Sequence, residues 1–158
     1  MDPDVTVSDV ARMAVAMEEK GMKFYTWAAG NFPDREVRDM FLRLAEEEKD
    51  HVRLFRKILE MPGAAEKLTP EVGKYLKMLA DSAGIFPHHR DITPETVKNP
   101  LDALAMGIQA EKDSILFYQE LYNRTDSLEV KETLSKLLQE EKLHLIELRE
   151  SMYELAAR

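Results

Sequence analysis

The residues with the clearest chemical potential form two Glu-x-x-His sequences, Glu48–His51 and Glu141–His144. On a helix, residues three apart share one face, so each sequence places a carboxylate and an imidazole where both can bind one metal ion. One Glu-x-x-His says little in a chain this rich in glutamate. Two copies, each matched by a further glutamate at the same offset, indicate a cluster of metal ligands.

The matching offset is 93 residues and extends over much of the chain. It relates Glu18 to Glu111 and Tyr25 to Tyr118, as well as the two Glu-x-x-His sequences, without any gap. Two unrelated amphipathic helices would share apolar positions, but they would not share these polar ones. The chain therefore contains an internal repeat. Tyr25 and Tyr118 are candidates for hydrogen bonds to the carboxylates, and the alternative is that they only fill the core.

Four long segments with helical periodicity must position these residues. Asn99-Pro100 is a typical helix start, and Asp126 with Glu129 has the spacing of a capping box. Pro62-Gly63 is a typical helix end. The four predicted helices cover residues 7–30, 34–61, 100–124 and 126–157.

The connections between these helices predict the topology. Short loops join the helices within the pairs 7–61 and 100–157, which makes the members of each pair antiparallel neighbours. The crossover 62–99 is long and is expected to hold a short helix from Pro70 to about Ser82, followed by extended chain. We therefore predict one all-α domain over residues 1–158, an antiparallel four-helix bundle with one long crossover.

In each predicted helix a glutamate interrupts the apolar stripe that should face the core. Four buried carboxylates would repel one another and lose their hydration, whereas two divalent cations would neutralise them. Imidazole and carboxylate ligands suit iron, manganese or zinc. A polar core of Glu–His hydrogen bonds, or a bundle turned to expose these residues, is the alternative. The predicted metal ligands are Glu18, Glu48, His51, Glu111, Glu141 and His144.

This arrangement resembles the ferritin-like di-iron carboxylate superfamily, specifically its rubrerythrin and bacterioferritin members. The resemblance covers both helix pairs and implies two iron ions, with manganese or zinc as substitutes. It implies that Glu48 and Glu141 bridge the two ions. Glu18 and His51 would then complete the coordination of one ion, and Glu111 and His144 that of the other.

The chain also departs from these relatives. It has no cysteine, and so no rubredoxin centre. Ile108 stands where rubrerythrins carry an additional glutamate one turn before the third-helix ligand, which puts their peroxidase activity in doubt here. Lys49 stands where bacterioferritins carry a haem-binding methionine. With the sequence ending at Arg158, we expect no fifth helix of the kind used in cage assembly, which disfavours a storage cage.

The resemblance implies an oxidoreductase that reacts with O₂ or H₂O₂ and takes electrons from a separate donor. Iron handling, with Fe²⁺ as the substrate, is the second hypothesis. A metal-stabilised bundle that acts as a sensor or adaptor is the third. The long crossover, by allowing helix pairs to exchange between chains, favours a homodimer.

The composition restricts the remaining possibilities. With 22 basic and 30 acidic residues, the net charge of −8 disfavours nucleic acid and anionic membranes as partners. The absence of a signal peptide or a membrane-spanning run favours a cytoplasmic protein. Two further features are expected to be solvated rather than functional: His88-His89 in the crossover, and Glu46 and Glu47 beside Glu48.

Overall fold

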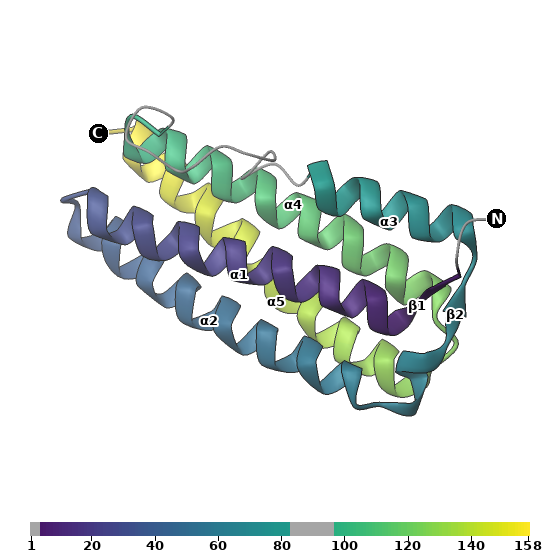
Figure 1. The fold of residues 1–158 in the computed structure, drawn as a ribbon. Coiled ribbons are helices and arrows are strands. Elements are labelled where there is room, and N and C mark those ends of the chain that lie inside the picture. Colours follow the sequence, from purple (N-terminus) through teal and green to yellow (C-terminus); the bar gives the residue numbers. More distant parts are fainter. Residues whose placement is uncertain (1–3, 83–96) are drawn as a thin grey trace.

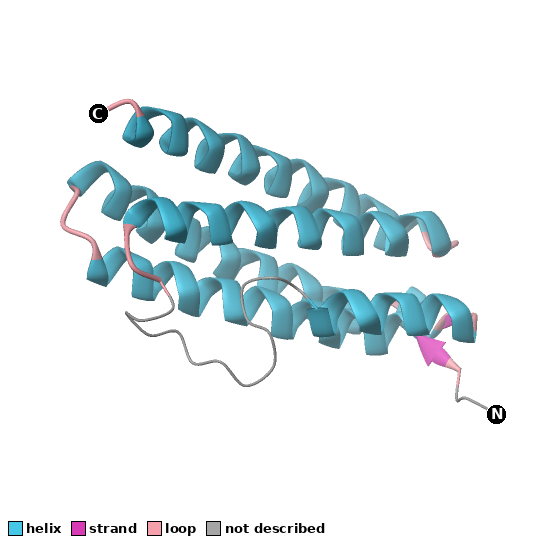
Figure 2. Ribbon diagram, turned by 90° about the horizontal axis from the view of Figure 1, so that it is seen from above, coloured by secondary structure: helices cyan, strands magenta, loops and turns pink. Residues whose placement is uncertain are grey.

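The computed structural model describes residues 4–82 and 97–158, and its architecture is a bundle of long helices (Figures 1 and 2). The helices run side by side along one long axis, and a shorter helix lies against one end of the bundle. They are α1 (Val7–Asn31), α2 (Arg35–Leu59), α3 (Pro70–Ser82), α4 (Pro100–Arg124) and α5 (Leu128–Ala156). The predicted fold class, including the short helix in the crossover, is confirmed.

Side-chain caps define where the long helices begin. Thr6 and Asp9 form a complete capping box at α1, while Asp34 caps α2 and Asn99 caps α4. The prediction for α5 was wrong by one residue, because Ser127 rather than Asp126 accepts the hydrogen bond from the Val130 backbone N–H. A hydroxyl at this position satisfies one of the otherwise unpaired amide groups of the first turn.

The segment after α2 differs from the expectation of a simple helix stop. The helix ends at Leu59, two residues earlier than predicted, and Pro62–Ala65 form a 3₁₀ turn, η1. The chain then pairs as β2 (Lys67–Leu68) with β1 (Val5–Thr6) in a two-residue antiparallel ladder that joins Val5 to Leu68. This ladder fixes the start of α1 against the beginning of the crossover.

Gly63 lets this segment approach the start of α5 closely. A Cβ atom at position 63 would overlap the Ser127 side chain, which caps α5. The carboxylate of Glu66 strengthens the same junction, since it accepts a hydrogen bond of 2.8 Å from the Asp126 backbone N–H. The two helix pairs are therefore locked together at this end of the bundle.

The core consists of two apolar clusters. One contains Phe55, Leu134 and Tyr118, and the other contains Phe41, Leu104 and Tyr25. The apolar stripes of the four long helices form most of both clusters, whereas Leu101 in the first turn of α4 is 37% exposed. The polar residues described below lie between the clusters.

Two further expectations concern membrane-spanning helices and the histidine pair of the crossover. Over the residues that the structure describes, no helix combines the length and the apolar character needed to cross a bilayer. His88 and His89, expected to be a solvated pair, lie outside the described residues.

Candidate metal centre

The six predicted ligands come from the four long helices and lie in the interior of the bundle. Helix α1 supplies Glu18 and α4 supplies Glu111, while α2 and α5 each supply one Glu-x-x-His sequence. All six are buried, and none is more than 4% exposed. The alternative in which the bundle turns these residues toward solvent is therefore wrong.

Four of the six residues form a compact group, because Glu48, His51, Glu141 and His144 each offer one ligand atom within 4.8 Å of the others. Glu141 directs Oε1 to His51 Nδ1 at 2.9 Å and Oε2 to His144 Nδ1 at 3.4 Å. Glu48 directs Oε1 to His144 Nδ1 at 3.2 Å and Oε2 to His51 Nδ1 at 3.9 Å. Each of these two carboxylates therefore presents one oxygen to each histidine.

The other two glutamates lie on opposite sides of this group. Glu18 Oε2 is 3.5 Å from His51 Nδ1, and Glu111 Oε1 is 3.5 Å from His144 Nδ1. Each approaches one histidine within ion-pair range. The cluster thus divides into two similar halves, one built on His51 and the other on His144. The adjacent Glu19 faces outward and forms an ion pair with Arg56 at 3.2 Å.

The central atoms of the cluster have lone pairs that the described part of the chain does not use. Five buried atoms make no hydrogen bond there, although several lie close together: Glu48 Oε1, both carboxylate oxygens of Glu141, and Nδ1 of His51 and of His144. Buried polar groups are almost always hydrogen-bonded. Unpaired oxygen and imidazole nitrogen atoms that converge on one point fit the donor set of a metal pair, and a satisfied polar core does not explain them.

Electrostatics in the absence of metal show how strongly this cluster attracts positive charge. Burial lowers the pKa of His51, but hydrogen bonding and the charge of Glu18 outweigh burial and raise it to about 9. The same balance, with Glu111 and Glu141 as the acidic neighbours, raises the pKa of His144 to about 10. Burial, followed by the charges of Glu111 and Glu18, raises the pKa of Glu141 well above 4.5. Without metal the cluster retains protons in place of cations.

The two repeat-related tyrosines contact the cluster across the bundle. Tyr25 on α1 donates a hydrogen bond of 2.6 Å to Glu111 Oε1 on α4, and Tyr118 on α4 donates one to Glu18 on α1. Each therefore contacts the glutamate of the opposite helix pair rather than the one two turns away on its own helix. Burial, and then the negative charge of Glu111 or Glu18, raises the pKa of both phenols, so they remain protonated donors.

Sequence reasoning missed two residues that contact the histidines from outside. Glu140 Oε2 is 2.8 Å from His51 Nε2, and Glu47 Oε2 is 2.7 Å from His144 Nε2. The expectation that Glu47 is only part of a solvated face is therefore wrong. A carboxylate at Nε2 holds the proton there and leaves Nδ1 free to bind metal. The 93-residue offset relates Glu47 to Glu140 and could have identified this pair.

Comparison with known proteins places this geometry in a family. The sequence model described as Rubrerythrin matches residues 9–152, which include every residue of the candidate metal centre. The chain belongs to the rubrerythrin family. No curated protein matches it significantly. A crystal structure from Thermotoga maritima, provisionally described as a ferritin-like diiron-carboxylate protein, superimposes with a TM-score of 0.70 at 27% identity, over 98% of this chain and 99% of that one.

The family and the fold together support a ferritin-like, rubrerythrin-type bundle with a candidate Glu/His metal site. The site combines the hard carboxylate and borderline imidazole ligands that iron, manganese and zinc accept. The four glutamates are buried, and once ionised they would carry four negative charges, which two divalent ions would balance.

Proposed function

We propose that this rubrerythrin-family chain is a di-iron oxidoreductase that reduces H₂O₂ or O₂ with electrons from a separate donor. One observation carries the proposal: Glu48 and Glu141 each direct one carboxylate oxygen to each histidine. That is the arrangement expected of two bridging ligands. The unpaired Nδ1 atoms of His51 and His144 would then each bind one ion.

The remaining residues fit two terminal positions. Glu18 lies beside His51 and would complete the coordination of one ion. Glu111 lies beside His144 and would complete that of the other. When bound, an iron pair supplies the two electrons needed to reduce peroxide to water. The protein's own contribution is to fix the ligands before reaction, so that little reorganisation is needed.

The surrounding side chains hold protons and exclude water. Tyr25 and Tyr118 keep their phenol protons and hydrogen-bond to Glu111 and Glu18, which fixes the orientation of those two carboxylates. Glu47 and Glu140 set the tautomer of the histidines from the outer side. The apolar clusters on either side limit the access of bulk water.

The test is anaerobic loading with two Fe²⁺ per chain, followed by stopped-flow mixing with H₂O₂ or with O₂. We expect both oxidants to oxidise the bound iron. When Fe²⁺ is added in excess, we expect oxidation to stop after two Fe²⁺ per chain. The variant Glu48→Ala/Glu141→Ala, which removes both candidate bridges, should retain no metal pair by elemental analysis. Two tightly bound ions in that variant would refute the ligand assignment. Sustained oxidation of excess Fe²⁺, with soluble retained iron, would instead show that iron handling is the function.

A further inference from the structure

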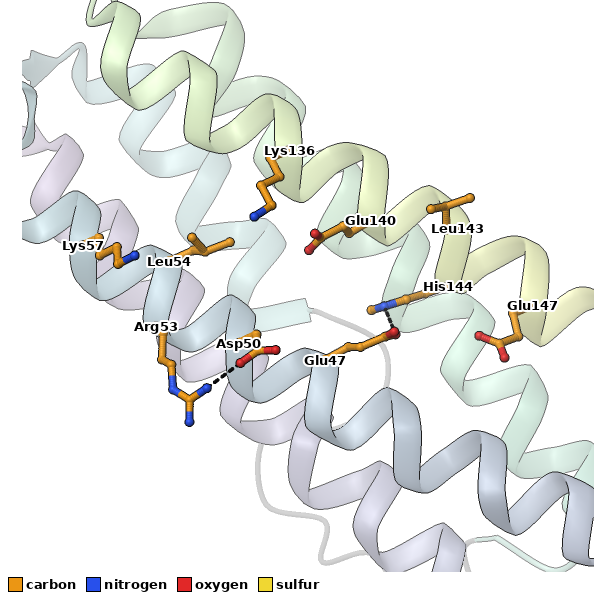
Figure 3. Close-up of a pocket in the computed structure, with 10 residues that line it drawn as sticks. All are labelled: Glu47, Asp50, Arg53, Leu54, Lys57, Lys136, Glu140, Leu143, His144 and Glu147. Carbon is orange, nitrogen blue, oxygen red and sulfur yellow. Dashed lines mark hydrogen bonds and ion pairs between the residues drawn. The ribbon is translucent and has the colours of Figure 1, made fainter.

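A cavity of about 600 Å³ lies between α2 and α5 on the outer side of the metal centre (Figure 3). His144 lines it, together with Glu47 and Glu140, the two carboxylates that contact the histidines from outside. The ring of His144 stacks on that of His51, with centroids 5.3 Å apart. The imidazole ring of His144 therefore separates this cavity from the ligand atoms at the middle of the cluster.

The internal repeat predicts that the outer face should look the same at both ends of this seam, but it does not. The 93-residue offset relates Leu54 to Glu147 and Lys136 to Arg43. At one end Arg43 and Glu147 form an ion pair that bridges α2 and α5. At the other end the corresponding residues are Leu54 and Lys136, which cannot form an ion pair. Both line the cavity, and Glu147 of the ion pair lines it at the opposite edge.

Other contacts reinforce the closed end of the seam. Arg158 at the end of the chain forms ion pairs with Asp34 and Glu36 at the start of α2. The hydroxyl of Ser151 on α5 contacts Met40 Sδ on α2 at 2.9 Å. Toward the C-terminus of α5 the seam is thus bridged by side chains and keeps a pocket of about 30 Å³ beside Glu36 and Arg158, whereas on the side of Leu54 it is open. The two ends differ because the two repeats carry different side chains at these positions.

We propose that the cavity is the route by which metal ions reach and leave the centre, and that Leu54 sets its width. The proposal rests on the metal site of the proposed function. At about 30 Å³ for each water, a divalent ion with six waters occupies roughly 200 Å³. The cavity, at about 600 Å³, is large enough to hold it. Arg53, Lys57 and Lys136 also line the cavity, but four carboxylates outnumber them, those of Glu47, Asp50, Glu140 and Glu147. Glu47 and Glu140, which are 43% and 38% exposed, attract a cation toward the histidines that they contact.

The experiment measures metal exchange rather than catalysis. Metal-free full-length protein is mixed with Co²⁺, and the rise of the cobalt absorption gives the uptake rate. Transfer from the loaded protein to excess chelator gives the release rate. In Leu54→Trp, the larger side chain should slow uptake and release equally, by about tenfold, because a barrier higher by about 1.4 kcal/mol acts in both directions. The equilibrium affinity should not change.

Three variants make the result specific. Leu42→Trp places the same bulk on α2 at a 47% exposed position outside the cavity and should exchange Co²⁺ like the parent. Leu54→Ala should accelerate uptake and release, and it decides the question if Leu54→Trp fails to fold. Leu59→Ala removes similar packing from the same helix outside the cavity, and it controls for faster opening of a less stable bundle.

Unchanged rates in Leu54→Trp, or equal acceleration by Leu54→Ala and Leu59→Ala, would overturn the route. The first result would show that ions bypass Leu54, and the second that they enter when the bundle opens. Failure of the metal site on which this proposal rests looks different, because the parent itself would then bind no pair of Co²⁺ ions. Failure of the oxidoreductase function alone would show in the stopped-flow test and would leave the exchange rates unaffected.

Discussion

Removing the metal should make the stability of this protein fall steeply as the pH rises above neutral. Without metal, the pKa of His51 is raised from 6.5 to about 9 and that of His144 to about 10. A group that holds its proton more tightly in the folded state stabilises that state fully below its unfolded pKa. The stabilisation is then lost as the pH rises through the folded pKa. The relevant window is therefore pH 6.5 to about 10.

The magnitude follows from the size of the shift. At about 1.36 kcal/mol per pKa unit, the rise from 6.5 to about 9 at His51 corresponds to about 3 kcal/mol. His144 adds to this, although by less than a second independent group, because both histidines interact with Glu141. The raised pKa of Glu141 has the same sign. For a chain of this size, 3 kcal/mol is a shift in Tm of about 6–12 °C.

Bound metal should reverse this dependence, since it replaces the protons on the histidines and carboxylates. It adds about 2.7 kcal/mol at free metal 100-fold above the Kd, and its advantage over the metal-free form should widen with pH. The assay is thermal unfolding from pH 6 to 9 of protein verified metal-free, and of the same protein loaded with zinc. The variant His51→Gln/His144→Gln should flatten the profile of the metal-free form. A metal-free Tm that is constant or rises over this range would refute the reasoning.

Four further results are expected. Tyr25→Phe removes the hydrogen bond to buried Glu111 and should lower the free energy of unfolding by about 1–3 kcal/mol, measured by denaturant titration. Ile108→Glu supplies a carboxylate one turn before Glu111, and stopped-flow oxidation should show a stronger preference for H₂O₂ over O₂ than in the parent. Gly63→Ala should destabilise by about 1–3 kcal/mol through overlap at the start of α5, whereas Gly30→Ala, which has open space, should not. Light scattering at tens of micromolar should show a homodimer, and a monomer would contradict this.

The fold could be predicted because its determinants are local and repeated. Apolar residues at helical spacing, a proline after Asn99 and two short loops define four helices and their antiparallel pairing. The errors lie where a local rule left two neighbouring candidates. Asp126 and Ser127 can both cap a helix, and only the contact of Glu66 with the Asp126 backbone, made across the bundle, decides between them. The ladder of β1 with β2 is likewise non-local and too short to leave a periodic pattern.

The central residues of the candidate centre could be predicted from the sequence, whereas the carboxylates that contact it from outside could not. Glu48, His51 and their repeat mates interrupt apolar stripes, and a buried charge leaves a clear signal in sequence. Glu47 leaves none, because a partly exposed glutamate on a helix looks like any solvated residue. Its role depends on the way that α2 and α5 cross. The repeat offset carries this information in the sequence, since it relates the contacts of His51, Glu18 and Tyr118 to those of His144, Glu111 and Tyr25.

The contacts of the centre cross between the helix pairs in a reciprocal manner, which ties the site to the fold. Tyr25 of the first pair binds Glu111 of the second, and Tyr118 of the second binds Glu18 of the first. His51 and His144 contact Glu140 and Glu47 in the same exchanged way. Neither pair can therefore complete a half-site alone, because the carboxylates that orient its ligands belong to the other pair. A metal ion bound in either half would therefore hold both pairs together.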